Sequence, residues 1–207
     1  MFVDTHAHIH QHDPDEIAGI MSRAAAADVG AVITAGVMVE DSRKAIALAR
    51  GHERIFAGVG VHPSDLAGPL TDADLTDLRD LAALPEVVGM SEIGIDHQER
   101  SPDRRWQEEA FQAQILVARH HGLPIVFHVR EQGDDYDAHS AKDVAVAILR
   151  ESGAGTPGGT AHYFQGRWKH AVQFLDLGFH ISFAKTLLRI SDLEETARKV
   201  PVDRMLI

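Results

Sequence analysis

The chain alternates short apolar runs with longer segments of helical periodicity along its 207 residues. The apolar runs have the length of buried strands and lie at 2–8, 31–37, 55–61, 87–95, 123–129, 160–164 and 179–183. Between them, apolar residues recur three and four positions apart, which predicts helices at about 14–29, 40–50, 70–84, 102–121, 140–151, 167–177 and 191–199. The last segment, VPVDRMLI, predicts a turn that enters an eighth strand.

This alternation implies parallel strands joined by right-handed helical crossovers. Seven complete units and the beginning of an eighth fit a (β/α)8 barrel better than an open sheet of five or six strands. A doubly wound, Rossmann-type sheet is the alternative, but it would need a glycine-rich turn after the first strand, where the chain reads THAHIHQH. We therefore expect an α/β fold of the TIM-barrel type, one domain over residues 1–207, incomplete at strand eight.

The composition excludes several kinds of functional site. The chain has no cysteine, which excludes disulfides, thiolate metal sites and a cysteine nucleophile. No apolar run approaches the length needed to cross a membrane, so we expect a cytoplasmic protein without membrane contacts. The formal net charge of −11 argues against a broad basic surface that coats nucleic acid, although a local site that binds it remains open.

Polar side chains are placed at the ends of the predicted strands. They are His6, His8, His62, Glu92, His128, Arg130 and His162. In a parallel barrel the carboxyl ends of all strands face one mouth, so these residues should converge there. A single such residue is usually structural, but imidazoles and a carboxylate gathered from five strands have the ligand chemistry of Zn²⁺ or Mn²⁺. The pattern predicts a metal site at this mouth.

Four histidines occupy alternate positions at the start of the chain, at 6, 8, 10 and 12. In a strand, side chains two residues apart point the same way, so His6 and His8 can bind one ion. Asp13 and Pro14 have the pattern of a helix start, which leaves His10 and His12 in a short loop. We expect neither loop histidine to touch metal or substrate.

At these positions the chain resembles the TatD family of metal-dependent hydrolases, whose barrels are amidohydrolase-like. FVDTHAHIH resembles the family's D-x-H-x-H strand, AGVGVHP its G-x-H-P turn, and GMSEIGIDH its G-E-x-G-L-D segment. LPIVFHVRE is similar to the P-hydrophobic-H-x-R strand, and GGTAHYFQG to the H-C-F-x-G strand, with Tyr163 in the usual cysteine place. These motifs occur in the family's order from residue 1 to residue 207.

The resemblance implies a hydrolase with two divalent ions, Zn, Mn or Mg. His6 and His8 would hold one ion, His128 and His162 the other, and Glu92 would bridge both. The catalytic residues would be Glu92, His62 and Arg130, the last two facing the scissile phosphate. Asp96 would orient a ligand or contact substrate, and a loop-capping role for it is an equal alternative.

Three functions are compatible with this pattern. The first is a TatD-type deoxyribonuclease that acts on DNA, and the second is the same metal chemistry on an amide, ester or lactone. Many amidohydrolase-like barrels carry a carboxylated lysine at the end of strand four, where this chain has Glu92, which favours the first. The third is an inactive relative whose histidines have lost their function.

The resemblance also carries an expectation about the end of the chain. Family members continue beyond the equivalent of RMLI into an E-T-D segment, whose aspartate is a metal ligand or base on the same side of the site as His6 and His8. We expect a chain without that segment, the rest of strand eight and the closing helices to have a half-formed first metal site and little nuclease activity.

Overall fold

A computed structural model describes residues 1–133 and 137–206. Its strands form one parallel sheet in chain order, β1 to β8. The strands are β1 Phe2–Ala7, β2 Val29–Ala35, β3 Ile55–Val59, β4 Val87–Asp96, β5 Ile125–Arg130, β6 Gly159–His162, β7 Phe179–Ser182 and β8 Met205–Leu206. The helices are α1 Pro14–Ala26, α2 Val39–Arg50, α3 Asp72–Ala82, α4 Arg104–His121, α5 Ser140–Glu151, α6 Trp168–Asp176 and α7 Ser191–Ala197. The predicted (β/α)8 order is confirmed.

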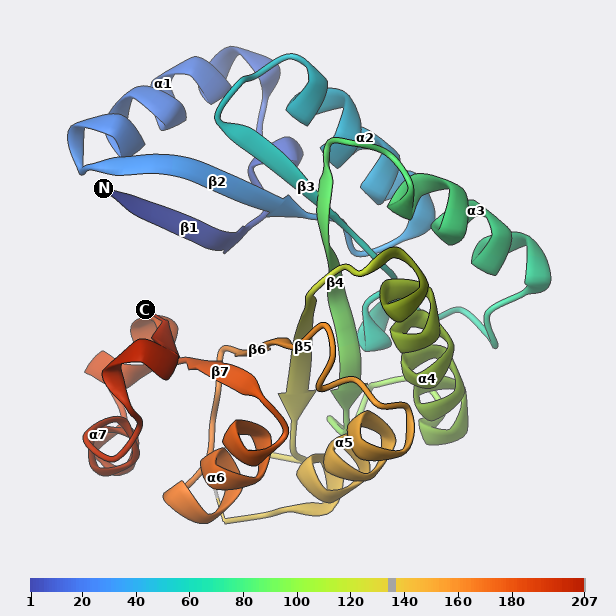
Figure 1. The fold of residues 1–207 in the computed structure, drawn as a ribbon, viewed down its shortest axis with the longest axis vertical. Coiled ribbons are helices and arrows are strands. Elements are labelled where there is room, and N and C mark those ends of the chain that lie inside the picture. Colours follow the sequence, from blue (N-terminus) through green and yellow to red (C-terminus); the bar gives the residue numbers. More distant parts are fainter. Residues whose placement is uncertain (134–136, 207) are drawn as a thin grey trace.

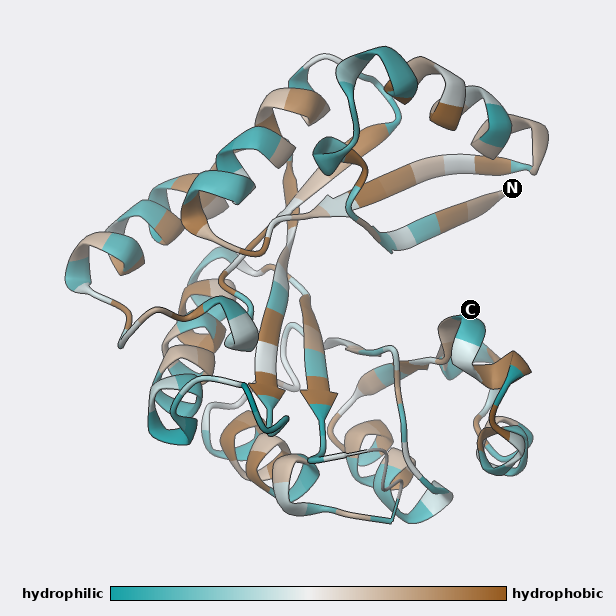
Figure 2. Ribbon diagram, turned by 180° about the vertical axis from the view of Figure 1, so that it is seen from behind, coloured by the Kyte–Doolittle hydropathy of each residue, from teal (hydrophilic) through white to brown (hydrophobic). Residues whose placement is uncertain are grey.

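The helices lie along the outer side of the curved sheet (Figure 1). Each is amphipathic: α4, for example, buries Phe111, Ile115 and Ala118, which are three and four residues apart, against the strands. The strands themselves are largely apolar, whereas the helices alternate between apolar and polar residues (Figure 2). Burial of this apolar surface is the main force that holds the helices on the sheet.

The start of α1 follows the sequence prediction, but its end does not. The Asp13 side chain accepts a hydrogen bond from the Asp15 N–H, and Pro14 occupies the first helical position. Gly30, which the sequence suggested as the end of the helix, lies inside β2. The chain instead turns at Asp28, whose φ of +61° is in the left-handed region that aspartate tolerates.

Strand β4 runs through the middle of the sheet, and all its residues except Val88 are buried. It carries Glu92 and Asp96, and its pairing with β5 places Gly94 opposite His128. The pairing of β5 with β6 then places His128 opposite His162. Gly94, His128 and His162 therefore lie in one row across β4, β5 and β6, and Glu92 is two residues before Gly94 on β4.

Gly94 makes this row possible. Its φ is +142°, and a Cβ atom built there would lie 2.0 Å from the His128 carbonyl oxygen. Only glycine lets the two backbones approach so closely.

The sheet is curved, and its first and last strands have one strand neighbour each. Strand β1 pairs with β2, and β8 pairs with β7 through Met205 and Leu206. Within residues 1–133 and 137–206, no pairing joins β8 to β1. Phe2 and Val3 on β1 are 60% and 50% exposed as a result. None of the helices among the described residues is long and apolar enough to span a membrane.

Candidate metal centre

The Glu92 carboxylate lies at the centre of the predicted site. Its Oε2 atom is 3.2 Å from His6 Nε2 and 3.8 Å from His8 Nε2. Its Oε1 atom is 3.4 Å from His128 Nδ1 and 3.8 Å from His62 Nε2. Each carboxylate oxygen therefore faces a different pair of imidazoles.

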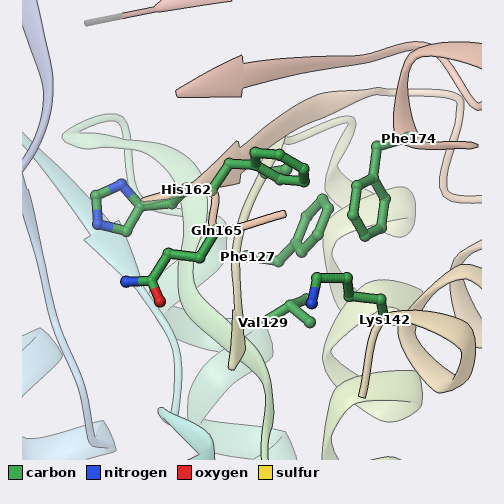
Figure 3. Close-up of a pocket in the computed structure, with 8 residues that line it drawn as sticks. Phe127, Val129, Lys142, His162, Gln165 and Phe174 are labelled. Carbon is green, nitrogen blue, oxygen red and sulfur yellow. The ribbon is translucent and has the colours of Figure 1, made fainter. Parts of the chain in front are cut away.

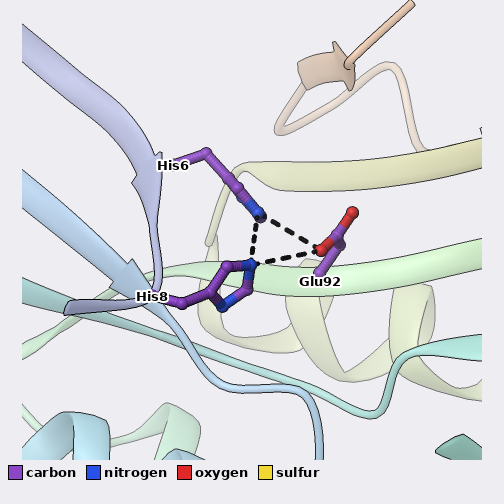
Figure 4. A group of neighbouring side chains, drawn as sticks. All are labelled: His6, His8 and Glu92. Atoms are coloured by element: carbon purple, nitrogen blue, oxygen red, sulfur yellow. Dashed lines mark hydrogen bonds and ion pairs between the residues drawn. The ribbon is translucent and has the colours of Figure 1, made fainter. Parts of the chain in front are cut away.

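The first group consists of His6, His8 and Glu92, which point toward one another from β1, the turn after it and β4 (Figure 4). The two Nε2 atoms are 3.2 Å apart. Two ligand atoms about 2.0–2.1 Å from one ion at the tetrahedral angle lie roughly 3.3 Å apart. The donor set and its spacing therefore fit one divalent ion.

The backbone orients His8. Its Nδ1 atom lies 2.8 Å from the Ala35 carbonyl oxygen at the end of β2. A carbonyl can only accept, so Nδ1 carries the proton and Nε2 presents its lone pair to the site. Burial, together with the nearby His6, lowers the pKa of His8, which favours the neutral ring that binds metal.

Asp96 orients His128 in the second group. The Asp96 Oδ2 atom accepts from His128 Nε2 over 2.9 Å, so Nδ1 is left to face Glu92. Burial opposes charge on His128, but its hydrogen bonds to Asp96 and Glu92 outweigh that effect and raise the pKa of His128 to about 9. Although burial alone would raise the pKa of Glu92, hydrogen bonds from His128 and His6 hold it well below its usual value.

His62 faces the same Glu92 oxygen as His128, at 3.8 Å instead of 3.4 Å, and has a different hydrogen-bonding pattern. The Ser64 backbone N–H donates to His62 Nδ1 over 3.2 Å. Burial and the neighbouring His128 lower the pKa of His62 to about 4, so the ring is neutral. Its one proton is therefore on Nε2, the atom that faces the site. This arrangement suits a hydrogen-bond donor toward substrate better than a ligand.

His162 approaches the site from β6. Its ring stacks on His6, with the ring centroids 3.7 Å apart. Burial, with His6 nearby, lowers the pKa of His162 to about 3, which leaves a neutral ring. Behind it, Phe127, Val129 and Phe174 line a cavity together with the Lys142 and Gln165 side chains (Figure 3).

The mouth of the centre is a cavity of about 330 Å³. Its lining brings together His62, Glu92, His128, Val129, Arg130, His162, Tyr163 and Gln165. The structure thus gathers the predicted residues at one mouth, whereas their individual roles stay predictions. The predicted partition gave His128 and His162 to one ion. Among the described residues, the tighter grouping around Glu92 Oε1 contains His128 and His62.

His10 and His12, which follow His8 in the chain, lie outside both groups of the described residues. His10 is nevertheless buried, with Nε2 2.9 Å from Asp41 Oδ2 and Nδ1 2.6 Å from Thr34 Oγ1. His12 is exposed next to Glu16. His10 therefore fixes the turn after His8 to the end of β2 and the start of α2.

Sequence reasoning missed several residues of the site. Ser91 Oγ lies 3.4 Å from His6 Nδ1, and the Ser64 backbone sets the His62 proton. Arg100 and Ser101, in the loop after β4, line a cavity next to the site and were also missed. Their position after a barrel strand was a usable signal, because such loops build the sites of these barrels.

Comparison with known proteins agrees with this geometry. The family model described as TatD related DNase matches residues 3–207. The chain belongs to the TatD family. The expected family resemblance is therefore confirmed over nearly the whole chain, and TatD-family membership makes it a metal-dependent hydrolase.

Two TatD-family relatives illustrate the match. The uncharacterized metal-dependent hydrolase YabD of Bacillus subtilis is 32% identical over 212 residues, covering 100% of this chain and 78% of the relative. The 3'-5' ssDNA/RNA exonuclease TatD of Cronobacter turicensis is 32% identical over 199 residues, covering 95% and 71%. The crystal structure of YJJV, a TatD homolog from Escherichia coli, superposes with a TM-score of 0.84 at 25% identity, covering 100% and 77%.

Proposed function

We propose that this TatD-family hydrolase is a two-metal phosphodiesterase that acts on DNA. The observation that carries the proposal is the position of Glu92, whose two oxygens face separate imidazole pairs. Such a carboxylate can give one oxygen to each of two ions. His6 and His8, which face Oε2, would complete one ion's ligands. His128, which faces Oε1, would hold the other ion together with His162 from β6, while His62 would act on the substrate.

Two divalent ions held by these residues would supply a nucleophile at neutral pH and stabilise negative charge on a phosphodiester. The chain's own residues orient the substrate. His62 Nε2–H points into the site and can donate to a phosphoryl oxygen. Arg130 lines the same cavity and offers a planar fork of donors that matches phosphate.

The choice of DNA is supported by the relatives and by the local charge. The Cronobacter relative is named as an exonuclease of single-stranded DNA and RNA. Arg130 places a cation at the mouth of a chain whose net charge is −11, which concentrates attraction for phosphate at the site. A strand-four glutamate in place of a carboxylated lysine also favours phosphodiester over amide or lactone hydrolysis.

The test is hydrolysis by metal-reconstituted protein of a short single-stranded DNA, the matching duplex and RNA, a p-nitrophenyl ester, a lactone and a dihydropyrimidine amide. We expect metal-dependent cleavage of DNA, at the low rate expected above for this chain, that Glu92→Gln abolishes and His12→Gln leaves intact. Cleavage of the ester, lactone or amide without cleavage of DNA would contradict the proposal. Loss of activity in both variants would also contradict it.

A further inference from the structure

A second cavity, of about 420 Å³, adjoins the candidate metal centre. Arg130 lines both cavities, and Asp96, which orients His128, forms part of the second wall. The other residues that line it are Ser64, Gln98, Glu99, Arg100 and Ser101. Every one of these side chains is polar or charged, so the cavity suits a charged ligand rather than an apolar one.

Its acidic and basic residues differ in what they already bind. Asp96 is fully engaged: Oδ2 accepts from His128, and Oδ1 accepts from the Gln98 N–H over 2.8 Å and the Ser101 hydroxyl over 2.7 Å. By contrast, within residues 1–133 and 137–206 neither Arg100 nor Arg130 has a side-chain hydrogen bond or ion pair. Besides the engaged Asp96, the lining therefore contains two guanidinium groups and one other carboxylate, that of the exposed Glu99.

The loop that carries Arg100 is held in place at its start, by Asp96 and Gln98. Gln107 Oε1 accepts from the Asp96 N–H over 2.7 Å, which fixes the end of β4 against α4. The Gln98 side chain donates to the carbonyls of Glu131 and Gly133, which follow β5. Hydrogen bonds therefore fix this wall of the cavity to the ends of β4 and β5.

We infer that this cavity is a subsite for a second phosphate group of the same substrate. The inference rests on the proposed phosphodiesterase function and specifies its substrate class: a strand with a phosphate on the nucleotide next to the scissile bond. Arg130 stands between the two cavities, so it can contact the scissile phosphate, while Arg100 contacts the next one. Unpaired guanidinium forks are the side chains best matched to phosphate oxygens.

The test compares three dinucleotides: dTpdT, which has only the scissile phosphate, and its 5'-phosphorylated and 3'-phosphorylated forms. Wild-type protein should have a kcat/KM for one phosphorylated form roughly ten- to a hundredfold above that for dTpdT. Arg100→Gln should reduce this ratio toward one. Arg54→Gln removes an exposed arginine before β3, at the opposite end of the strands, and should keep the wild-type ratio.

Equal kcat/KM for all three dinucleotides in the wild-type protein would overturn the subsite while leaving the phosphodiesterase proposal intact. If no dinucleotide is cleaved, the phosphodiesterase proposal fails, and calorimetric titration of the same compounds decides on the subsite. Tighter binding of a phosphorylated form by wild type and Arg54→Gln, but not by Arg100→Gln, supports it. If each of the three proteins binds the phosphorylated and unphosphorylated dinucleotides equally, the subsite inference is overturned.

Discussion

The Asp96 carboxylate accepts a hydrogen bond of 2.9 Å from His128 Nε2, on the side of the imidazole opposite Glu92. Both residues come from paired strands, β4 and β5, so the geometry is set by the sheet rather than by a loop. An imidazole that donates to a carboxylate is held in one tautomer and becomes a stronger metal ligand. Asp96 thus contacts His128 through Oδ2 and caps the loop after β4 through Oδ1, so both alternatives that the sequence left open have contacts in the structure. Its role as a positioning residue for a metal ligand stays a prediction.

Asp96→Asn should lower affinity for the second ion about 10- to 100-fold, because the amide keeps the shape of the side chain but not its charge. Calorimetric titration with Zn²⁺ or Mn²⁺ measures this. Asp80→Asn, on the exposed side of α3, is the matched control and should bind as the wild type does. Unchanged metal affinity in Asp96→Asn would show that Asp96 has no such role.

Glu92→Gln should reduce the bound metal from two ions per chain to at most one. The substitution leaves one oxygen and one amide nitrogen, and an amide nitrogen is not a ligand for these ions. Elemental analysis after dialysis against metal-free buffer gives the stoichiometry. His12→Gln, which changes an exposed histidine of the same segment, should retain both ions; two ions in Glu92→Gln would rule out the bridging role.

Gly94→Ala should destabilise the fold by about 2–4 kcal/mol. The new Cβ would lie 2.0 Å from the His128 carbonyl oxygen, at a φ of +142° that alanine avoids. Gly68→Ala is the control, since a Cβ there has no atom within 4 Å and should change stability little. Urea unfolding gives both free energies, and equal values would mean that β4 and β5 are not so close at this point.

His170 should make stability depend on pH. It is buried in α6, and burial together with the Lys142 and Lys169 ammonium groups lowers its pKa to about 4. Between the unfolded-state pKa of about 6.5 and this value, the unfolded chain binds a proton here that the folded chain does not. The free energy of unfolding should therefore fall as the pH is lowered through this window, by about 3 kcal/mol at most from this residue.

The difference between wild type and His170→Asn isolates this effect from other histidines. Asparagine keeps an acceptor for the Arg167 backbone N–H, which donates to His170 Nδ1 over 3.2 Å. Unfolding by urea at pH 4.5, 5.5 and 7.5 should show a shallower pH dependence in the variant. Parallel curves for the two proteins would mean that His170 titrates normally.

The sequence predicted the parts of the site that depend on local pattern. Strand periodicity predicted that His6 and His8 lie together, and they do, although His8 follows the end of β1. The alternation of strands and helices placed Glu92, His128 and His162 at one mouth. The rest depends on pairing register and on backbone groups distant in sequence. The Ala35 carbonyl that orients His8 is 27 positions away in the sequence, and Asp41, which contacts His10, is 31 positions from it. Neither contact can therefore be predicted from a local spacing of residues.

The most direct test of the central claim, that Glu92 bridges two ions, is anomalous diffraction from crystals of the protein loaded with Mn²⁺ or Zn²⁺. Two peaks about 3.5–4 Å apart, one on each side of the Glu92 carboxylate, are the predicted result. The peak near Oε2 should be within ligand distance of His6 and His8, and the other within ligand distance of His128. A single peak that does not touch Glu92, or none at this mouth, would contradict the account.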